Sequence, residues 1–349
     1  MKDLLQKYDS HHIFDVLKNF PAQVRQGLEI GYEADVSKID ASRIRNIVIS
    51  GLGGSAIGGD ILRSYLAPEL PVPVLVNRHY TLPHFVDQHS LVIVSSYSGD
   101  TEETLSVFDV AVARGAQLLV ITSGGRLGAI AGDLKLPAIF IPGGLAPRCA
   151  LGYSFFPMLK AMIKLGLIPE RPKDIEETLV TLRDSTDVYA AYDSNLNRAI
   201  EISKKIIGRI PIIYSAQDRL DAVNMRWRCQ LEENAKVLSY GNVFPELNHN
   251  EIVGWEQHPG ILEKFIVLVL RNRDEHARIV PRIDFTVRTI KPFAAEIIEC
   301  TAGERSLLAR IFGLICLGDW ISFYMAMFSS IDPYPIEKIA ALKKELEKE

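Results

Sequence analysis

Short apolar runs alternate with amphipathic stretches through the first half of the chain. Five such runs follow one another from residue 46, and small or polar residues close most of them: NIVIS, PVPVLVN, SLVIVSS, AQLLVITSGG and LPAIFIPGG. The segments between them, such as LSVFDVAVARG, carry apolar residues at helical spacing. Buried strands that alternate with helices predict βαβ units, in which helices cover both faces of a parallel sheet.

The same alternation returns in the second half. Its expected strands are RIPIIYSAQ, AKVLSYGN, KFIVLVLRN and FTVRTIKP, and two helices are expected at residues 305–327 and from 335 onward. A Pro- and charge-rich stretch, LIPERPKD at residues 167–174, is the best candidate for a linker. We therefore predict an α/β fold with two three-layer αβα domains, each with a mainly parallel sheet. The expected boundaries are a helical segment at 1–45 and domains at 46–166 and 175–349.

Composition is that of an ordinary soluble globular protein, with 48% hydrophobic and 23% charged residues. The net charge of −4 argues against nucleic acid or an anionic membrane as the main partner. The apolar runs are too short or too interrupted to span a bilayer, and the N-terminus lacks the apolar core of a signal peptide. Widely spaced cysteines without a CxxC pair favour reduced thiols and a cytoplasmic location: Cys149, Cys229, Cys300 and Cys316.

Three strands of the first half end in small polar loops, at residues 53–55, 95–101 and 122–125. Ligands of parallel sheets bind beyond the carboxyl ends of the strands, so these loops are expected to form one pocket. The stretch SSYSGDTEET places several hydroxyls before a helix, whose N-terminus favours an anion. The pattern predicts a phosphate site without lysine. The alternative is that Ser98 or Thr101 only caps the helix.

The glycine loop GLGGSA, residues 51–56, satisfies the G-x-G-x-x-G/A pattern of a dinucleotide site. Such a site also needs an acidic residue after the next strand, but that strand ends in Asn77 and Arg78. Arg78 could serve a 2′-phosphate, yet the neighbouring hydroxyl loops would then have no role. The loop also lacks the Gly-Lys-Ser/Thr of a P-loop. We expect no nucleotide cofactor, and tight helix–strand packing explains the glycines in part.

Candidate acids, bases and cations lie in three further stretches. RWRCQLEENAK places Glu232 and Glu233 near the end of a helix, and FPELNHNEIVGW places His249 between two asparagines. Arg148 follows the fifth strand in PGGLAPRCALGYSF, where its planar guanidinium suits an oxyanion or phosphate. Solvent-exposed helix faces, caps and surface ion pairs are the alternatives. No HExxH or second histidine at ligand spacing points to a metal site.

Together these motifs resemble those of a known family. GLGGSAIGGD, SSYSGDTEETL, PGGLAPRCALGYSF, ENAK and PELNHNEIVGW, in this order, are similar to the bifunctional phosphoglucose/phosphomannose isomerases. These enzymes belong to the phosphoglucose isomerase superfamily and are built from two sugar-isomerase (SIS) domains. The resemblance covers nearly the whole chain. It implies interconversion of glucose 6-phosphate and mannose 6-phosphate with fructose 6-phosphate through a cis-enediol, without metal or coenzyme.

The resemblance also implies residue roles. Ser96, Ser98 and Thr101 match the phosphate-binding hydroxyls, and Gly54 and Ser55 match the glycine loop that contacts the sugar. The catalytic residues implied are Glu233 as the base between C2 and C1, His249 in ring opening, and Arg148 near the enediolate. A lysine on the C-terminal helix is also expected. Among Lys338, Lys343, Lys344 and Lys348, the family pattern is best matched by Lys343.

The superfamily supplies this histidine from the other subunit, so the resemblance implies a homodimer in which His249 completes the neighbouring site. Two other functions stay open at this point. One is a non-catalytic SIS module that senses a sugar phosphate, which would keep the hydroxyl loops but lose Glu233 and His249. The other is an SIS isomerase of a different phosphosugar, against which ENAK and NHNEIVGW argue.

Overall fold

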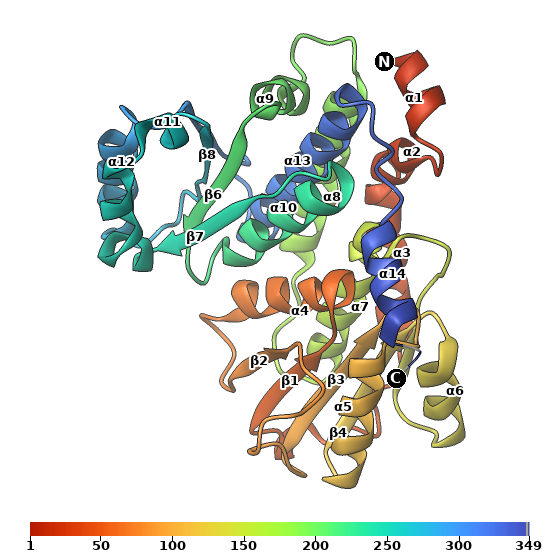
Figure 1. The fold of residues 1–349 in the computed structure, drawn as a ribbon. Coiled ribbons are helices and arrows are strands. Elements are labelled where there is room, and N and C mark those ends of the chain that lie inside the picture. The colour runs from red at the N-terminus through yellow and green to blue at the C-terminus, as the bar shows by residue number, and fades with distance from the viewer. Residues whose placement is uncertain (347, 349) are drawn as a thin grey trace. The chain divides into compact units, whose positions relative to one another are not determined.

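The computed structural model describes residues 1–346 and 348, which form two compact units. Each unit is built on one parallel sheet with helices packed against it (Figure 1). The β1–β5 unit comprises Asn19–Val180 and Ser306–Ala309. The β6–β9 unit comprises Met1–Lys18, Thr181–Arg305 and the chain from Arg310 onward.

The sheet of the β1–β5 unit contains the five strands that the sequence predicts. They are β1 (Asn46–Ser50), β2 (Val74–Asn77), β3 (Ser90–Ser96), β4 (Gln117–Thr122) and β5 (Ala138–Phe140). All neighbours are parallel, in the order β2-β1-β3-β4-β5. Every residue of β3 is buried, as expected for a central strand with helices on both faces.

Side chains on the two faces of this sheet pack against different helices. On one face, alternate valines and leucines of β1, β3 and β4 form a core with α5 (Glu102–Ala113) and α6 (Gly125–Asp133). Helix α4 (Gly53–Leu66) lies on the other face. Its Gly59 packs so closely against Ile49 of β1 that a Cβ on Gly59 would lie 2.7 Å from the Ile49 side chain. Helix α7 (Leu151–Lys164) packs against α4 and against α3 (Phe20–Glu33). This is the expected three-layer αβα arrangement.

The sheet of the β6–β9 unit has four parallel strands in the order β7-β6-β8-β9. They are β6 (Ile210–Ala216), β7 (Tyr240–Phe244), β8 (Phe265–Leu270) and β9 (Glu296–Cys300). Three of the four expected strands are present, although β7 begins only at Tyr240 within the stretch AKVLSYGN. The fourth prediction, FTVRTIKP, is wrong because most of this segment lies in helix α12 (Ile279–Ile290).

Helix α12 shows why that prediction failed. The run FTVRTI is rich in β-branched residues, which favour strands. However, the buried residues Ile283, Thr286 and Ile290 recur at helical spacing, and the two isoleucines pack on the sheet. The actual fourth strand, EIIEC, has only five residues with glutamates at positions 296 and 299. Burial of one helical face therefore outweighs local strand propensity.

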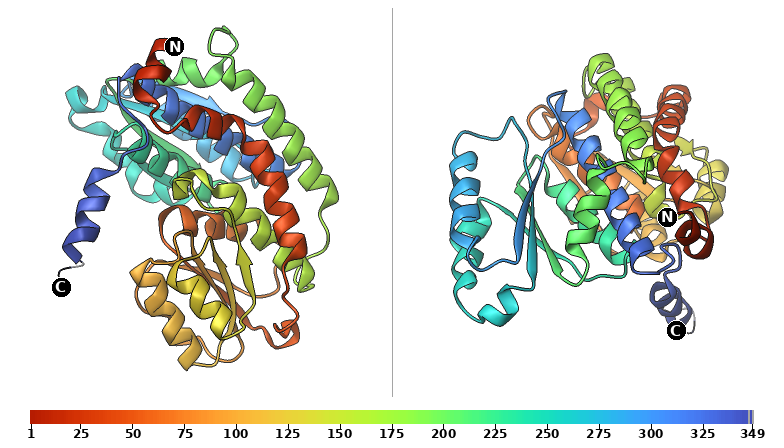
Figure 2. Two further views of the ribbon diagram at one scale, coloured as in Figure 1. Left: turned by 90° about the vertical axis from the view of Figure 1, so that its right-hand side faces the viewer. Right: turned by 90° about the horizontal axis from the view of Figure 1, so that it is seen from above.

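Helices also cover both faces of the second sheet. One face packs against α12 and a segment made of η3 (Glu246–His249), η4 (Glu251–Glu256) and α11 (Pro259–Leu262). Figure 2 shows α11 and α12 on one side of these strands. Helix α10 (Asp221–Asn234) packs on β6 and β7, and the Trp227 indole donates a hydrogen bond to Leu314 O of helix α13 (Leu307–Phe328).

The remaining elements lie before, between and after the sheets. They are α1 (Lys2–Tyr8), α2 (Ile13–Lys18), η1 (Ala41–Arg43), η2 (Pro147–Cys149), α8 (Pro172–Ala190), α9 (Arg198–Ile206) and α14 (Glu337–Leu346). Helix α8 begins inside the stretch expected to be a linker. The domain boundaries at 46–166 and 175–349 stay a prediction.

Helix α13 is long and strongly apolar. Its length and hydropathy would suffice to cross a membrane, but 94% of its most apolar window is buried inside the protein. Its aromatic residues, Trp320 and Phe323 among them, pack on one another and on Phe14 of α2. This burial shows that α13 is a core helix. The four cysteines, all in the described part of the chain, are free thiols.

Candidate active site

Hydrogen bonds join the three polar loops at the carboxyl ends of β1, β3 and β4. The backbone N–H of Tyr97 donates to Ser55 Oγ over 3.0 Å, which links the first loop to the second. The hydroxyl of Ser123 donates to Tyr97 O over 2.6 Å, which links the second loop to the third. The loops therefore form one continuous edge, and that they enclose a single pocket stays a prediction.

The turn between β3 and α5 holds the three expected phosphate-binding hydroxyls. Ser96 Oγ donates to Thr101 Oγ1 over 3.0 Å and accepts from the N–H of Gly99 over 3.1 Å. Ser98 is exposed, and its Oγ accepts from the N–H of Asp100 over 3.3 Å. Thr101 is the N-cap residue of α5, but its side chain caps no backbone N–H within the described chain. Capping therefore does not account for the side chain of Thr101.

Hydrogen bonds shape the third loop, residues 122–125, and connect the start of α6 to the turn between β3 and α5. Thr122 Oγ1 donates to Gly124 O over 2.9 Å, and Asp100 Oδ1 accepts from the N–H of Arg126 over 3.0 Å. The carboxylate of Asp100 thus occupies the N-terminus of α6. At Gly99, with φ of +79°, a Cβ would lie 1.9 Å from Gly124 O. Only glycine permits this approach of the two loops.

The glycine loop brings the Arg148 segment against the start of α4. A Cβ on Gly54 would lie 2.5 Å from the carbonyl carbon and oxygen of Pro147 and 2.7 Å from Arg148 N. Close packing therefore explains this glycine, although its neighbour is the Pro147 segment and not the expected strand. Arg148 itself is buried, with 3% of its surface exposed. Gly54, Ser55 and Arg148 thus lie at one edge of the β1–β5 unit with the hydroxyl turn.

The alternative of a 2′-phosphate site at Arg78 finds no support in the structure. Arg78 forms an ion pair with Asp60, a buried residue of α4. A guanidinium already paired with a carboxylate is poorly suited to bind a phosphate as well. This ion pair instead joins the end of β2 to α4.

Glu233 lies in the last turn of α10, where buried polar contacts hold the helix. Arg226 forms a two-pronged ion pair with Asp319 of α13, at 3.1 and 2.7 Å, and Gln230 donates to the same carboxylate over 3.0 Å. Burial raises the pKa of Asp319, and the Arg226 guanidinium opposes that shift. Next to Glu233, Asn234 donates to Ser322 Oγ over 3.0 Å. Two residues of α13 therefore hold the helix that carries Glu233.

Helix α10 ends directly after Glu233, at Asn234, and the chain changes direction at Lys236. Lys236 has a left-handed φ of +59°, and its ammonium group donates to the backbone oxygens of Glu233 and Pro333. Ser239 Oγ donates to Glu232 Oε1 over 3.2 Å. Lys236 therefore closes the helix end, and Glu232 helps to secure the chain that follows. Glu233 is half-buried, whereas Glu232 is exposed.

His249 is exposed at the end of the short η3 turn, between two asparagines that are both held. Asn248 Nδ2 donates to Thr286 Oγ1 of α12 over 2.8 Å, and Asn250 Nδ2 donates to Glu246 Oε1 over 2.7 Å. This arrangement presents a histidine at the surface of the unit on a backbone that is fixed on both sides.

The sequence does not predict a hydrogen-bond network that lies next to this turn and centres on Glu251. Tyr214 of β6 donates its hydroxyl hydrogen to Glu251, and Asn242 donates to Glu251 Oε2 over 2.7 Å. Trp255 Nε1 donates to the Tyr214 hydroxyl over 3.1 Å. Burial, followed by the nearby Glu251 carboxylate, raises the pKa of Tyr214. The partners come from two strands and from η4, so no local pattern could reveal them.

The structure thus holds the predicted site residues in two sets, one in each unit. Gly54, Ser55, Arg148 and the hydroxyl turn belong to the β1–β5 unit. Glu233, His249 and Lys343 belong to the β6–β9 unit, on α10, η3 and α14. Lys343 is exposed on α14, as are the neighbouring candidates Lys338 and Lys344.

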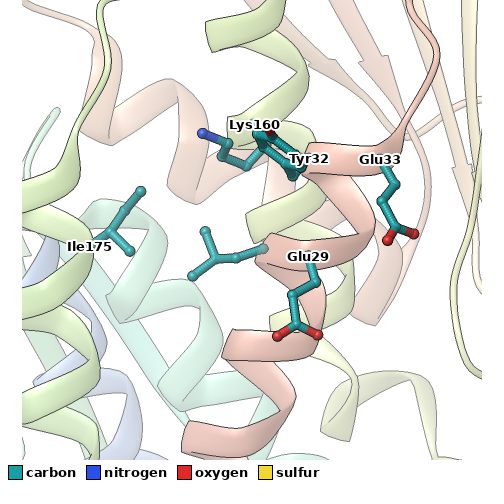
Figure 3. Close-up of a pocket in the computed structure, with 6 residues that line it drawn as sticks. Glu29, Tyr32, Glu33, Lys160 and Ile175 are labelled. Carbon is teal, nitrogen blue, oxygen red and sulfur yellow. The ribbon is translucent and has the colours of Figure 1, made fainter.

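A hollow of about 340 Å³ lies elsewhere on the β1–β5 unit (Figure 3). It is lined by residues of α3, α7 and α8, among them Glu29, Glu33 and Lys160. Lys160 is paired with Glu170 at 3.1 Å. The predicted site residues are not among those that line this hollow, so we assign it no part in the site.

Comparison with known proteins identifies the family. Residues 195–346 match the model of the bacterial phospho-glucose isomerase C-terminal SIS domain. A bifunctional phosphoglucose/phosphomannose isomerase of Caldicellulosiruptor bescii is 43% identical over 335 residues, which cover 96% of this chain and 98% of that protein. The chain belongs to the bifunctional phosphoglucose/phosphomannose isomerase family. A second relative with this name, from Aquifex aeolicus, is 35% identical over 316 residues, covering 90% of this chain and 94% of that protein.

Solved structures agree on the fold. A hypothetical protein from Thermus thermophilus superimposes with a TM-score of 0.74 at 15% identity, covering 99% of this chain and 92% of that protein. The family resemblance, the fold class and the expectation of an isomerase are confirmed. The alternative of a non-catalytic sensor is thereby set aside. The roles of individual residues stay predictions.

Proposed function

We propose that this isomerase interconverts glucose 6-phosphate and mannose 6-phosphate with fructose 6-phosphate through a cis-enediol intermediate. The observation that carries the proposal is 43% identity, over 96% of the chain, to an enzyme named for both activities. The hydroxyl-lined edge of the β1–β5 unit supports it, because a phosphosugar needs an anion site. No step of the proposed reaction needs a metal ion or a coenzyme.

The phosphate group would be held at the turn between β3 and α5. Ser96, Ser98 and Thr101 supply three hydroxyls there, and the N-terminus of α5 adds backbone donors and a partial positive charge. Ser96 and Gly99 already share a hydrogen bond that shapes the turn. Binding the phosphate at this fixed turn orients the carbon chain of the sugar for reaction. Gly54 and Ser55 contact the sugar in this account.

Proton transfer between C2 and C1 would be carried out by Glu233. A single carboxylate on one face of a planar enediol can remove the proton from one carbon and return it to the next. The buried contacts of α10 support this role, because they fix the backbone around Glu233. Negative charge develops on the substrate oxygens during this step, and Arg148 would stabilise it.

Ring opening would be assisted by His249 and Lys343. It needs a proton removed at O1 and another delivered at O5, and these two side chains have suitable chemistry. We further propose that the active protein is a homodimer in which His249 of one chain completes the site of its neighbour. The exposed position of His249 supports this arrangement.

The proposed setting is sugar phosphate metabolism in the cytoplasm, in glycolysis or gluconeogenesis. The free thiols support the cytoplasmic location. We propose no membrane and no nucleic acid as a partner. An SIS isomerase of another phosphosugar is the remaining alternative.

Isomerisation in D₂O tests both the activity and the mechanism. Starting from mannose 6-phosphate, the account predicts fructose 6-phosphate that carries deuterium at C1, because the proton on the catalytic carboxylate exchanges with solvent in some turnovers. Product formed without deuterium would contradict an enediol with an exchangeable base. Absence of product would contradict activity on this epimer.

A further inference from the structure

Tyr97 lies between Ser96 and Ser98 in the hydroxyl turn and is hydrogen-bonded to three other segments at this edge of the sheet. Its backbone N–H donates to Ser55 Oγ in the glycine loop over 3.0 Å. Its backbone oxygen accepts from the N–H and from the hydroxyl of Ser123 in the third loop, at 3.0 and 2.6 Å. These bonds are made by the main chain of Tyr97, and its side chain reaches a further segment.

The phenol of Tyr97 joins the two ends of the loop that follows β5. Its hydroxyl donates to Pro142 O over 2.9 Å and accepts from the N–H of Leu145 over 3.1 Å. A phenol can do both at once, because it carries one donor hydrogen and oxygen lone pairs. A carbonyl and an N–H three residues apart bond each other directly in many β-turns. Here the Tyr97 oxygen lies between them, so it couples the hydroxyl turn to this loop.

The composition of this loop makes its backbone adaptable. Gly143 and Gly144 lie between Pro142 and Leu145 and are exposed, and Gly144 has a φ of +90°. Glycine has no Cβ to restrict the main chain, so ordering two of them in succession costs conformational entropy. The bonds to the phenol fix the chain on both sides of this glycine pair.

Arg148 lies three residues beyond Leu145, in η2. Directly after it, Cys149 O accepts from Gln23 Nε2 of α3 over 2.9 Å. The segment that carries Arg148 is therefore attached to α3 on one side and to Tyr97 on the other. All of these residues belong to the β1–β5 unit, which also contains the hydroxyl turn.

We propose that Tyr97 is a positioning residue, which holds Arg148 at a fixed distance from the phosphate site. The proposal rests on the functions proposed above for the hydroxyl turn and for Arg148. In that account the phosphate is anchored at the turn, while negative charge develops on oxygens at C1 and C2, at the other end of the sugar. A cation stabilises this charge best when it is already placed where the charge develops. Tyr97 meets this need, because it forms part of the turn and its phenol holds the loop that leads to Arg148.

A comparison of two tyrosine variants tests the proposal. Tyr97→Phe removes the phenolic hydroxyl but keeps the ring and the main-chain bonds. Tyr153→Phe is the matched control, because Tyr153 of α7 lies in the same unit and loses one phenol bond, to Gln26 Oε1 of α3 at 2.6 Å. With glucose 6-phosphate as the substrate, we expect kcat of Tyr97→Phe to fall at least about tenfold and KM to change less than about twofold. Tyr153→Phe should keep kcat within about twofold of the wild type.

A pair of ligands tests whether Tyr97 acts through Arg148. 5-Phosphoarabinonate carries a carboxylate where the enediolate is charged, whereas arabinitol 5-phosphate has a neutral hydroxymethyl group at that position. In titration calorimetry, Tyr97→Phe should weaken binding of the acid at least about fivefold and binding of the neutral ligand less than about twofold. Arg148→Gln should remove most of the preference for the acid, and adding Tyr97→Phe to it should cause no further loss.

Two results would overturn the proposal. Equal weakening of both ligands by Tyr97→Phe would show that this residue supports only the phosphate turn. Values of kcat and of both affinities that match those of Tyr153→Phe would show that the phenol positions nothing. A wild-type protein that binds both ligands but forms no fructose 6-phosphate would contradict the proposed function instead, and the calorimetric comparison would still decide the role of Tyr97.

Discussion

The hydroxyls of Ser96 and Thr101 are hydrogen-bonded to each other, 3.0 Å apart, across the turn that joins β3 to α5. This bond connects the last residue of a buried strand with the N-cap residue of a helix. It therefore fixes the shape of the turn. The Thr101 side chain makes no capping bond to its own helix within the described chain.

Replacing Ser96, Ser98 and Thr101 together by alanine should raise KM for the phosphosugar more than it destabilises the fold. The variant loses the bonds of Ser96 to Thr101 and Gly99, each worth about 1 kcal/mol, but the Gly99 N–H keeps its bond to Ser96 O. Steady-state kinetics and thermal unfolding of the triple variant test this expectation. A large loss of stability with unchanged KM would mean that these hydroxyls are structural.

Glu233→Gln should abolish turnover and leave phosphosugar binding nearly unchanged, because it removes the base but keeps the size of the side chain. Glu232→Gln is the matched control, since Glu232 is the preceding residue of the same helix and is exposed. It should keep most of the activity. Measuring kcat and ligand affinity for both variants separates the roles. Comparable kcat losses in the two variants would argue against Glu233 as the base.

Gly54→Ala should destabilise the protein by about 1–3 kcal/mol, because the new methyl group would overlap the Pro147 carbonyl and push Arg148 away. Gly132→Ala is the control, because a Cβ at that exposed helical position would meet no described atom within 4 Å beyond its own turn of helix. It should be neutral or stabilising by up to about 1 kcal/mol. Urea unfolding of both variants measures the difference. Equal stabilities would contradict the close approach at Gly54.

Glu296 links β9 to Lys205 and Arg209 at 2.7 and 3.0 Å. Its hydrogen bond with Lys205, and then that with Arg209, lower the pKa of the Glu296 carboxyl below 4.5 against the effect of burial. The stabilisation is therefore complete above pH 4.5 and is lost as pH falls through the lowered pKa.

Glu296→Gln should accordingly cost about 0.5–1 kcal/mol at pH 7, a small value because the charges are partly exposed. The difference from the wild type should shrink as the pH falls below 4.5. Urea unfolding as a function of pH measures it, and Glu304→Gln serves as an exposed control with a smaller effect. A difference that grows toward acid pH would contradict this account.

The sequence predicts most of the β1–β5 unit because its strands are buried on both faces and read as continuous apolar runs. It fails at FTVRTIKP, where a helix buries Ile283, Thr286 and Ile290 despite the β-branched composition. The strand beside it, EIIEC, is short and carries two glutamates, and one of them, Glu296, is satisfied by ion pairs with α9 and the residue before β6. Partners of this kind are distant in sequence, so no local pattern marks the strand.

In the site, too, local sequence patterns predict some features, whereas others depend on residues distant in the chain. The hydroxyl loops and the glycine loop are recognisable because the chemistry is concentrated in short stretches at strand ends. The contact of Gly54 with Pro147 and the bond from Tyr214 to Glu251 depend on residues that meet only after folding. The bond between Asn248 and Thr286 is equally non-local. Packing between distant segments therefore determines how rigidly each candidate residue is held.

The central claim is isomerase activity on both epimers. The most direct measurement incubates the purified protein with EDTA, supplies glucose 6-phosphate or mannose 6-phosphate, and follows the formation of fructose 6-phosphate. The account predicts product from both substrates without added metal or coenzyme. Binding of both sugars with no product from either would contradict it.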